Sequence, residues 1–172
     1  MTEIQIAGVT LSDPDLTEAD VELAWGVIQE ECGWHVAPVV EQTLTLDGNG
    51  APVLALPSLR VVEVLSVFVD GVDVTDDVQW SEAGLLRRKS CRVFPQRYRS
   101  VVVTLRHGFD SMPRALAALT KRGALNADGG SKQIMAGPFL EINRDEDADG
   151  ALGFSKAAKA ALARYQLPGL PS

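Results

Sequence analysis

The sequence predicts an α+β protein in which a small antiparallel helical bundle carries an antiparallel β domain, inserted between the first and second long helices. Apolar residues recur every three or four positions ahead of Gly33, which is the period of an amphipathic helix. Between residues 40 and 109 the apolar period switches to two, which is typical of half-buried strands. A helical pattern then returns. We therefore expect a helical scaffold over residues 16–33 and 111–166, a β insert over 40–109 and a tail over 167–172.

The first helix is predicted from its apolar face and from the residues at its ends. Val21 and Trp25 lie four positions apart and therefore share a face. Asp15 or Thr17 is expected to cap the N-terminus, because side-chain oxygens there accept hydrogen bonds from unpaired backbone amides. Gly33 readily adopts the left-handed conformation that ends many helices. The helix is therefore expected to end at residue 31 or 32.

Five to seven short, mostly antiparallel strands are expected in the insert. The sequence Asp47-Gly48-Asn49-Gly50 favours a tight turn, so the strand before it is expected to return directly in the strand after it. Residues 59–69 are mainly apolar on both strand faces, which predicts a strand covered on both sides. The expected strands are residues 41–46, 53–56, 59–69, 72–74, 78–80, 85–88 and 100–107.

Two more helices are predicted after the insert. The sequence Ser111-Met112-Pro113 combines a capping hydroxyl with a proline in the first turn, and the helix it begins is expected to end near Gly123 or Asn126. Ser155 is expected to cap a last helix that ends near Tyr165. The remaining six residues are too rich in proline and glycine to fold alone.

Length and composition indicate a single domain with an insertion. A chain of 172 residues can bury one core of ordinary size but is too short for two full domains. Its 46% hydrophobic and 23% charged residues argue against a disordered chain and against a membrane protein. Two cysteines are too few for a disulfide framework, and no signal segment opens the chain, so an intracellular protein is expected.

The charges are segregated along the chain. Residues 85–122 hold ten basic residues and one acid, a net charge of +9, whereas residues 1–33 hold eight acids and no base. Such a chain can pair acid against base with its own copies, or present its basic part to DNA. A third interpretation, simple solvation of the basic residues, stays open. The candidate interface residues are Arg87, Arg88, Lys89, Arg92, Arg97 and Arg99.

No complete catalytic or metal-binding set is found, and no cofactor is expected. Structural zinc sites draw their ligands from closely spaced pairs, a pattern that the two cysteines and two histidines do not show. Another combination, His107 with Asp110 and Ser111, has the residue types of a hydrolytic triad. The three lie within five positions of one another, which is too close for an in-line proton relay. The chain is therefore expected not to be an enzyme.

One loop has part of a calcium-binding pattern. Asp145, Asp147 and Asp149 occupy the first, third and fifth loop positions, and Gly150 occupies the sixth. The twelfth position should be a bidentate glutamate but is Lys156. The three aspartates are thus a weak calcium candidate, and a solvated acidic loop is the simpler interpretation.

The order of these parts resembles the head-to-tail connector (adaptor, or head-completion) proteins of long-tailed actinobacteriophages. The resemblance covers about residues 16–165. It is carried by Cys32-Gly33-Trp34-His35 at the end of the first helix, by residues 56–62 leading to 67–71, by residues 80–88, and by residues 101–109 ahead of Pro113.

This resemblance implies a structural protein of the virion neck, assembled in the cytoplasm of the bacterial host. Such proteins form a ring, typically of twelve copies, beneath the portal protein, with the tail or a stopper protein below. Genomic double-stranded DNA passes through the lumen without sequence-specific binding, and no membrane is involved. The resemblance also implies that Tyr165, Leu167 and Leu170 dock on the portal. The alternative from composition is a small nucleic-acid-binding module that uses the basic β block.

Overall fold

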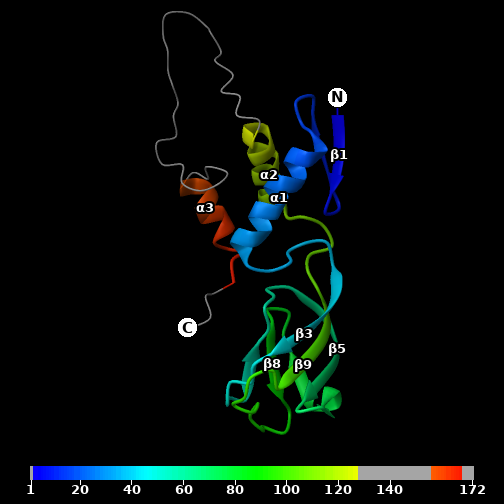
Figure 1. Ribbon diagram of the computed structural model, residues 1–172, viewed down its shortest axis with the longest axis vertical. Coiled ribbons are helices and arrows are strands. Elements are labelled where there is room, and N and C mark those ends of the chain that lie inside the picture. Colours follow the sequence, from blue (N-terminus) through cyan, green and yellow to red (C-terminus); the bar gives the residue numbers. More distant parts are fainter. Residues whose placement is uncertain (1, 128–155, 168–172) are drawn as a thin grey trace, which may run out of the picture. The chain divides into compact units, whose positions relative to one another are not determined.

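The computed structural model describes residues 2–127 and 156–167 (Figure 1). The chain divides into two compact units. We call the unit of residues 1–32 and 112–166 the helical unit, and the unit of residues 33–111 and 167–172 the β unit. The mixture of helices with antiparallel sheets confirms the α+β class predicted from the sequence.

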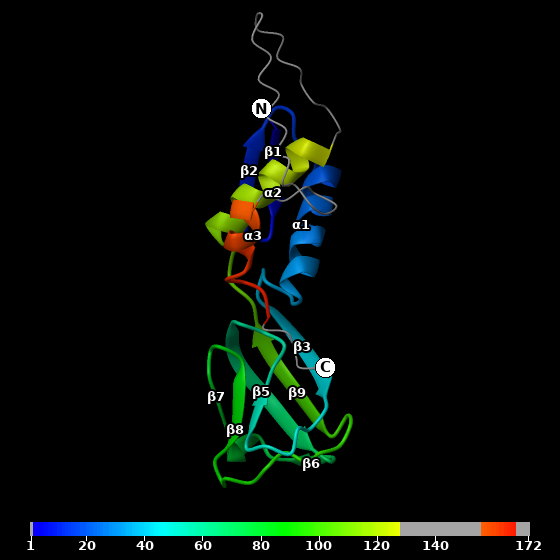
Figure 2. The same ribbon diagram turned by 90° about the vertical axis from the view of Figure 1, so that its left-hand side faces the viewer.

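The helical unit contains α1 (Glu18–Cys32), α2 (Arg114–Ala127) and α3 (Lys156–Leu162). The backbone amide of Asp20 donates to the Thr17 hydroxyl at 3.2 Å, so Thr17 is the N-terminal cap of α1. Gly33 follows α1 with a φ of 75°, as the sequence predicted. Helix α1 packs against α2, and α3 packs against both (Figure 2).

The helical unit also contains a hairpin that the sequence analysis missed. Strands β1 (Thr2–Ile6) and β2 (Val9–Asp13) pair antiparallel around Ala7 and Gly8, which both have positive φ. Ile4 and Leu11 face each other across the pair and are buried. The hairpin packs against α1 and α2, so the expected purely helical bundle is a mixed unit.

The β unit consists of two antiparallel sheets. In the larger sheet the strand order is β3 (Val40–Leu46), β9 (Val101–His107), β5 (Val61–Val69) and β6 (Val72–Asp73). In the smaller sheet it is β4 (Val53–Ala55), β8 (Leu85–Arg88) and β7 (Val78–Trp80). A short 3-10 helix, η1 (Thr75–Asp77), leads into β7. All seven predicted strands are present within two residues of their expected limits, and all pairs are antiparallel.

Side chains from both sheets bury one shared core. Val103 and Leu105 of β9 are fully buried with Leu86 of β8, and Leu54 of β4 joins them. Phe94, from the loop after β8, is also fully buried in this core. Each sheet therefore has an inner face toward this core and an outer face that points away from it.

The expected return of β3 into β4 through a tight turn is wrong. Strand β3 pairs with β9, whereas β4 pairs with β8 in the other sheet, so the connection crosses between sheets. Gly48 lies in this connection. A Cβ atom at this position would come within 1.8 Å of the Pro95 carbonyl oxygen, so a side chain does not fit here. The glycines at this turn serve a close backbone approach as well as chain reversal.

Candidate interaction surfaces

The six basic residues predicted as an interface are not equivalent in the structure. They lie on β8 and on the loop that follows it, and alternation along β8 points Arg87 outward and Arg88 inward. Arg88 is only 7% exposed, and its guanidinium lies 2.6 Å from the Asp77 carboxylate. An aspartate of the same unit therefore neutralises the charge of Arg88, and a role of Arg88 at an interface stays a prediction.

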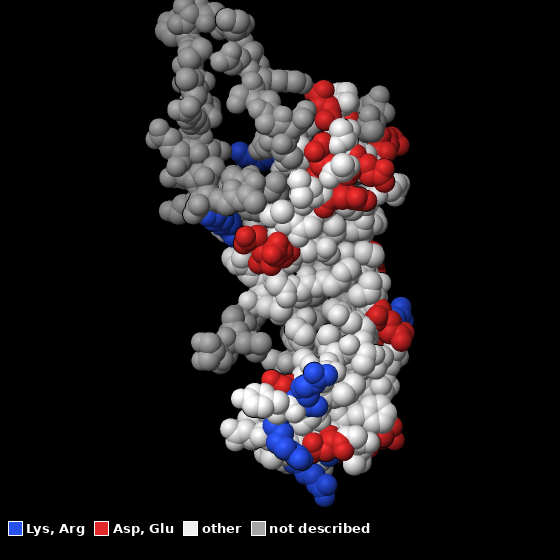
Figure 3. All heavy atoms as spheres, viewed as in Figure 1, with Lys and Arg blue, Asp and Glu red and all other residues white. Residues whose placement is uncertain are grey.

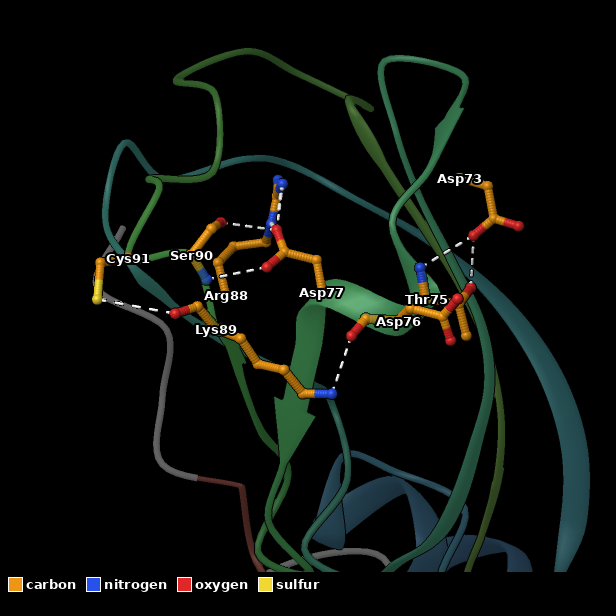
Figure 4. Close-up of polar contacts among 8 residues, drawn as sticks. All are labelled: Asp73, Thr75, Asp76, Asp77, Arg88, Lys89, Ser90 and Cys91. Atoms are coloured by element: carbon orange, nitrogen blue, oxygen red, sulfur yellow. Dashed lines mark hydrogen bonds and ion pairs between the residues drawn. The ribbon is translucent and has the colours of Figure 1, made fainter.

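Asp77 is the centre of a polar cluster that ties η1 to the end of β8 (Figure 4). Its carboxylate accepts hydrogen bonds from the Ser90 hydroxyl at 2.7 Å and from the Ser90 amide at 2.9 Å. These bonds, together with Arg88, lower the pKa of Asp77 from 3.8 to about 2. Lys89 adds a hydrogen bond from its ammonium to the Asp76 carbonyl at 2.8 Å. Asp77 therefore stays ionised at neutral pH and fixes the start of the loop.

The other end of this loop is held by Arg97 and Arg99. The Arg97 guanidinium forms an ion pair with Asp70. The backbone amide of Arg99 donates to the Asp47 carboxylate at 2.7 Å, and Arg99 itself has a φ of 52°. The loop is thus attached at both ends by charge-assisted hydrogen bonds.

Three arginines of the group keep their charge available. Arg87, Arg92 and Arg99 are exposed and have no ion-pair partner among residues 2–127 and 156–167. Two apolar side chains of the same loop are exposed beside them, Val93 at 55% and Tyr98 at 89%. Exposed arginine next to an exposed tyrosine is a combination enriched at protein interfaces.

The helical unit presents the opposite charge. Figure 3 shows acidic side chains gathered over α1 and basic side chains gathered on part of the β unit. The exposed acids of α1 have no ion-pair partner in the described part of the chain; they are Glu18, Glu22, Glu30 and Glu31. Helix α1 therefore offers negative charge to a partner, and β8 with the loop after it offers positive charge.

The residues predicted to dock on a portal fall at the end of the described chain. Tyr165 lies one turn beyond α3, and its amide donates to the Leu162 carbonyl at 2.8 Å. It lines an open depression of about 410 Å³ between α2 and α3, together with Ala115, Ala161 and Arg164. Leu167 is partly exposed. Leu170 and the calcium candidates Asp145, Asp147 and Asp149 lie outside the described residues.

The two histidines and the two cysteines do not form a site. His107 is buried, and its Nε2 lies 2.9 Å from the Gln42 amide oxygen. Burial, and then the nearby His35, lower the pKa of His107, so its imidazole is neutral at pH 7. Burial also raises the pKa of the Cys32 thiol to about 11. Among the described residues no group of three or more His, Cys, Asp or Glu side chains could hold a metal ion.

One exposed surface escaped the sequence analysis. Strand β5 was expected to be covered on both faces, but Val62, Leu65 and Phe68 on its outer face are each more than a third exposed. The irregularities of β5 against β9, one between Val61 and Glu63 and one between Val64 and Ser66, hide this pattern from a period-two analysis. Searched over the described chain, no helix is long and apolar enough to cross a membrane.

The fold is similar to that of proteins from the neck of a phage-like particle. No protein-family profile matches the sequence, and no curated protein matches it. A chain in the neck of the native GTA (gene transfer agent) particle, computed with C12 symmetry, matches with a TM-score of 0.61 and 12% identity over 99% of this chain and 98% of that one. A chain in the neck of the empty GTA particle, computed with C6 symmetry, matches with a TM-score of 0.56 and 14% identity over 90% and 79%. These likenesses show a shared fold.

Proposed function

We propose that this chain is a structural head-to-tail connector (adaptor) protein, which forms a ring with its own copies in the neck of a tailed bacteriophage. The observation that carries the proposal is the fold match over almost the whole of both chains, with a protein from a neck that has C12 symmetry. A match of that extent includes both the helical unit and the β unit, so it does not rest on a common submotif.

The segregation of charge supports assembly with identical copies. A cyclic ring is built from heterologous contacts, in which one surface of a subunit meets a different surface of the next. An acidic α1 and a loop with two unpaired arginines, Arg92 and Arg99, are two such different surfaces. Complementary charge of this kind favours the correct register between neighbours more than it adds affinity.

The finer assignments follow the sequence resemblance. We place twelve copies beneath the portal of a long-tailed actinobacteriophage, with Tyr165, Leu167 and Leu170 on the portal and a tail or stopper protein below. The virion neck is then the site of action and the host cytoplasm the site of assembly. Double-stranded DNA passes through the lumen. A lumen wall with few unpaired basic side chains lets DNA slide, because each contact between a basic side chain and a phosphate strengthens binding.

The assembly state of the purified chain tests the proposal. We expect rings in negative-stain electron microscopy, and in native mass spectrometry, when the chain is mixed with the portal protein encoded by the same genome. The portal should stay bound on size-exclusion chromatography. A chain that is monomeric with and without that portal would contradict the proposal.

A DNA-binding assay separates the connector from the alternative, a nucleic-acid-binding module. A module should bind isolated duplex DNA with a steep dependence on salt, since every phosphate contact releases counterions. The structure leaves three arginines of the basic group unpaired, so a connector should bind duplex only weakly. Tight binding that weakens steeply between low and physiological salt would favour the module.

A further inference from the structure

The outer face of the larger sheet carries exposed apolar side chains along β5, among polar ones such as Glu63 and Ser66. Along β5, Phe68 lies opposite Val102 on this face, away from the buried Val101 and Val103. The two irregularities of β5 each add one residue to the strand, and the added residues Val62 and Leu65 are 39% and 38% exposed. Phe68 is 36% exposed. We call Val62, Leu65 and Phe68 the β5 strip.

Beside the β5 strip lies an open depression with acidic walls. Its volume is about 420 Å³, and it is lined by Leu65 and Ser66 of β5 and by the segment from Asp73 to Asp77. The carboxylates of Asp73 and Asp76 are exposed and have no ion-pair partner in the described part of the chain. Hydrogen bonds from Thr75 lower the pKa of Asp73, so its negative charge persists in mild acid.

The outer face of the smaller sheet has the complementary character. Leu85 of β8 and Val53 of β4 are 48% and 37% exposed. Val53 lies directly opposite Arg87, whose charge has no partner among the residues described. Because the two sheets share one core, this face points away from the β5 strip. We call Val53, Leu85 and Arg87 the β8 face.

One ion pair fixes the two surfaces relative to each other. Asp77 lines the acidic depression, and its partner Arg88 is the neighbour of Arg87 on β8. Figure 4 shows Asp73 and Cys91 on opposite sides of this pair. A ring of many copies closes only when the rotation from one copy to the next is constant, and a rigid link between the two surfaces meets that need.

We propose that the β5 strip and acidic depression of one copy bind the β8 face of the next copy. This contact rests on the proposed function as a ring, and it is the interface between the β units of neighbouring copies. Apolar residues meet apolar residues at its centre, and Arg87 meets Asp76 at its rim, which is the usual arrangement of a protein interface. A symmetric contact between two β5 strips would instead bring two acidic rims together, and like charges repel. Phosphate groups of DNA are disfavoured on the strip for the same reason.

Disulfide trapping between copies tests the contact on the full-length chain. Two variants are prepared, Leu65→Cys and Leu85→Cys, each with Cys91→Ser to remove the exposed native thiol. Cys32 is buried and does not compete. An equimolar mixture of the two variants should give cross-linked dimers in roughly tenfold greater yield than either variant alone. The control variant is Leu23→Cys on α1, a position 58% exposed and outside both surfaces, which should give only background adducts.

A charge exchange checks that the trapped contact uses the proposed rim. Arg87→Glu in the Leu85→Cys chain should lower the mixed yield by about tenfold, because two carboxylates then face each other. Adding Asp76→Lys to the Leu65→Cys chain should restore it. Neither residue is buried, so both variants should keep the circular dichroism spectrum and thermal midpoint of the parent.

The outcomes separate this contact from the ring itself. The contact is supported if the yield of cross-links between the two variants decreases with Arg87→Glu and is restored by Asp76→Lys. Equal yields for mixed and single variants, or no yield above the Leu23→Cys control, overturn it. Rings seen by electron microscopy without mixed cross-links would overturn the β-unit contact and leave the connector function standing. Chains that stay monomeric with the portal would count against both.

Discussion

The helical unit and the β unit use their charges in different ways. In the β unit, carboxylates pair with four of the eight basic side chains, with Arg88 on Asp77, Arg97 on Asp70, Arg60 on Glu82 and Arg106 on Glu63. In the helical unit Lys121 pairs with Asp13, while the exposed acids of α1 stay unpaired among the described residues. The basic group of residues 87–99 therefore offers a partner fewer charges than its sequence suggests, whereas the exposed acids of α1 remain available.

The net charge of a sequence segment therefore overstates the charge that a partner can contact. A basic run of strand and loop includes inward positions, whose charges need partners inside the unit. A helix with an apolar stripe keeps its acids on the remaining faces. Four experiments test this comparison, and those with the strongest consequences come first.

Phe94→Ala tests whether the β unit has a core of its own. The ring is fully buried, and its removal should lower the free energy of unfolding by about 3–5 kcal/mol. Urea denaturation followed by circular dichroism measures the loss. Val93→Ala is the matched control, because the adjacent side chain is 55% exposed and should change stability by less than about 0.5 kcal/mol. Equal losses for the two variants would contradict the buried position of Phe94.

Arg88→Met against Arg97→Met tests the two kinds of ion pair in the β unit. Arg88 is buried, so its removal leaves Asp77 with an uncompensated charge and should lower the thermal midpoint clearly. Arg97 has a 66% exposed side chain, and its pair with Asp70 should contribute less than about 1 kcal/mol. Thermal unfolding of both variants compares them. A larger loss for Arg97→Met would reverse the assignment.

His107→Gln tests where the pH dependence of stability arises. The folded pKa of His107 lies below its usual 6.5, so the unfolded state binds the proton more readily. Its contribution is fully present above about pH 6.5 and is lost as the pH falls toward the folded pKa. The parent should therefore lose stability between about pH 7 and pH 5, and the variant should lose less. Urea titrations at several pH values measure the slope. An unchanged slope would exclude His107 as its source.

Thiol labelling compares the reactivity of one cysteine from each unit, and it does not change the stability of the protein. Burial raises the pKa of Cys32 in α1 to about 11, so its reactive thiolate is scarce. Cys91 in the β unit is exposed. An aromatic disulfide reagent at neutral pH should label one thiol in the native protein and both in denaturant. Loss of the native labelling in Cys91→Ser would identify the reactive residue.

Much of the secondary structure could be predicted because its signals are local. Thr17 and Gly33 mark the ends of α1, and the seven strands of the β unit follow from alternation and turn residues. The β1–β2 hairpin carried the same kind of signal, since Ile4, Ile6, Val9 and Leu11 alternate around a glycine-containing turn. The first thirteen residues thus contain the pattern of a hairpin.

The candidate surfaces could be predicted only in part. The sequence identified a basic group, but it could not tell Arg87 from Arg88, because alternation says that neighbours point apart and leaves open which one points inward. The β5 strip was hidden for a related reason. Two irregularities shift the alternation of β5, and their positions depend on its pairing with β9.

The α+β class, the limits of the β-unit strands and the separation of acidic from basic segments follow from sequence alone, because these features depend on residues close to one another along the chain. Tertiary structure decided that β3 pairs with β9 and not with β4, that Asp77 takes up Arg88, and that Val62, Leu65 and Phe68 share an uncovered face. These features need partners far away in sequence. Their energies arise from packing and desolvation, which exist only once the two sheets have come together.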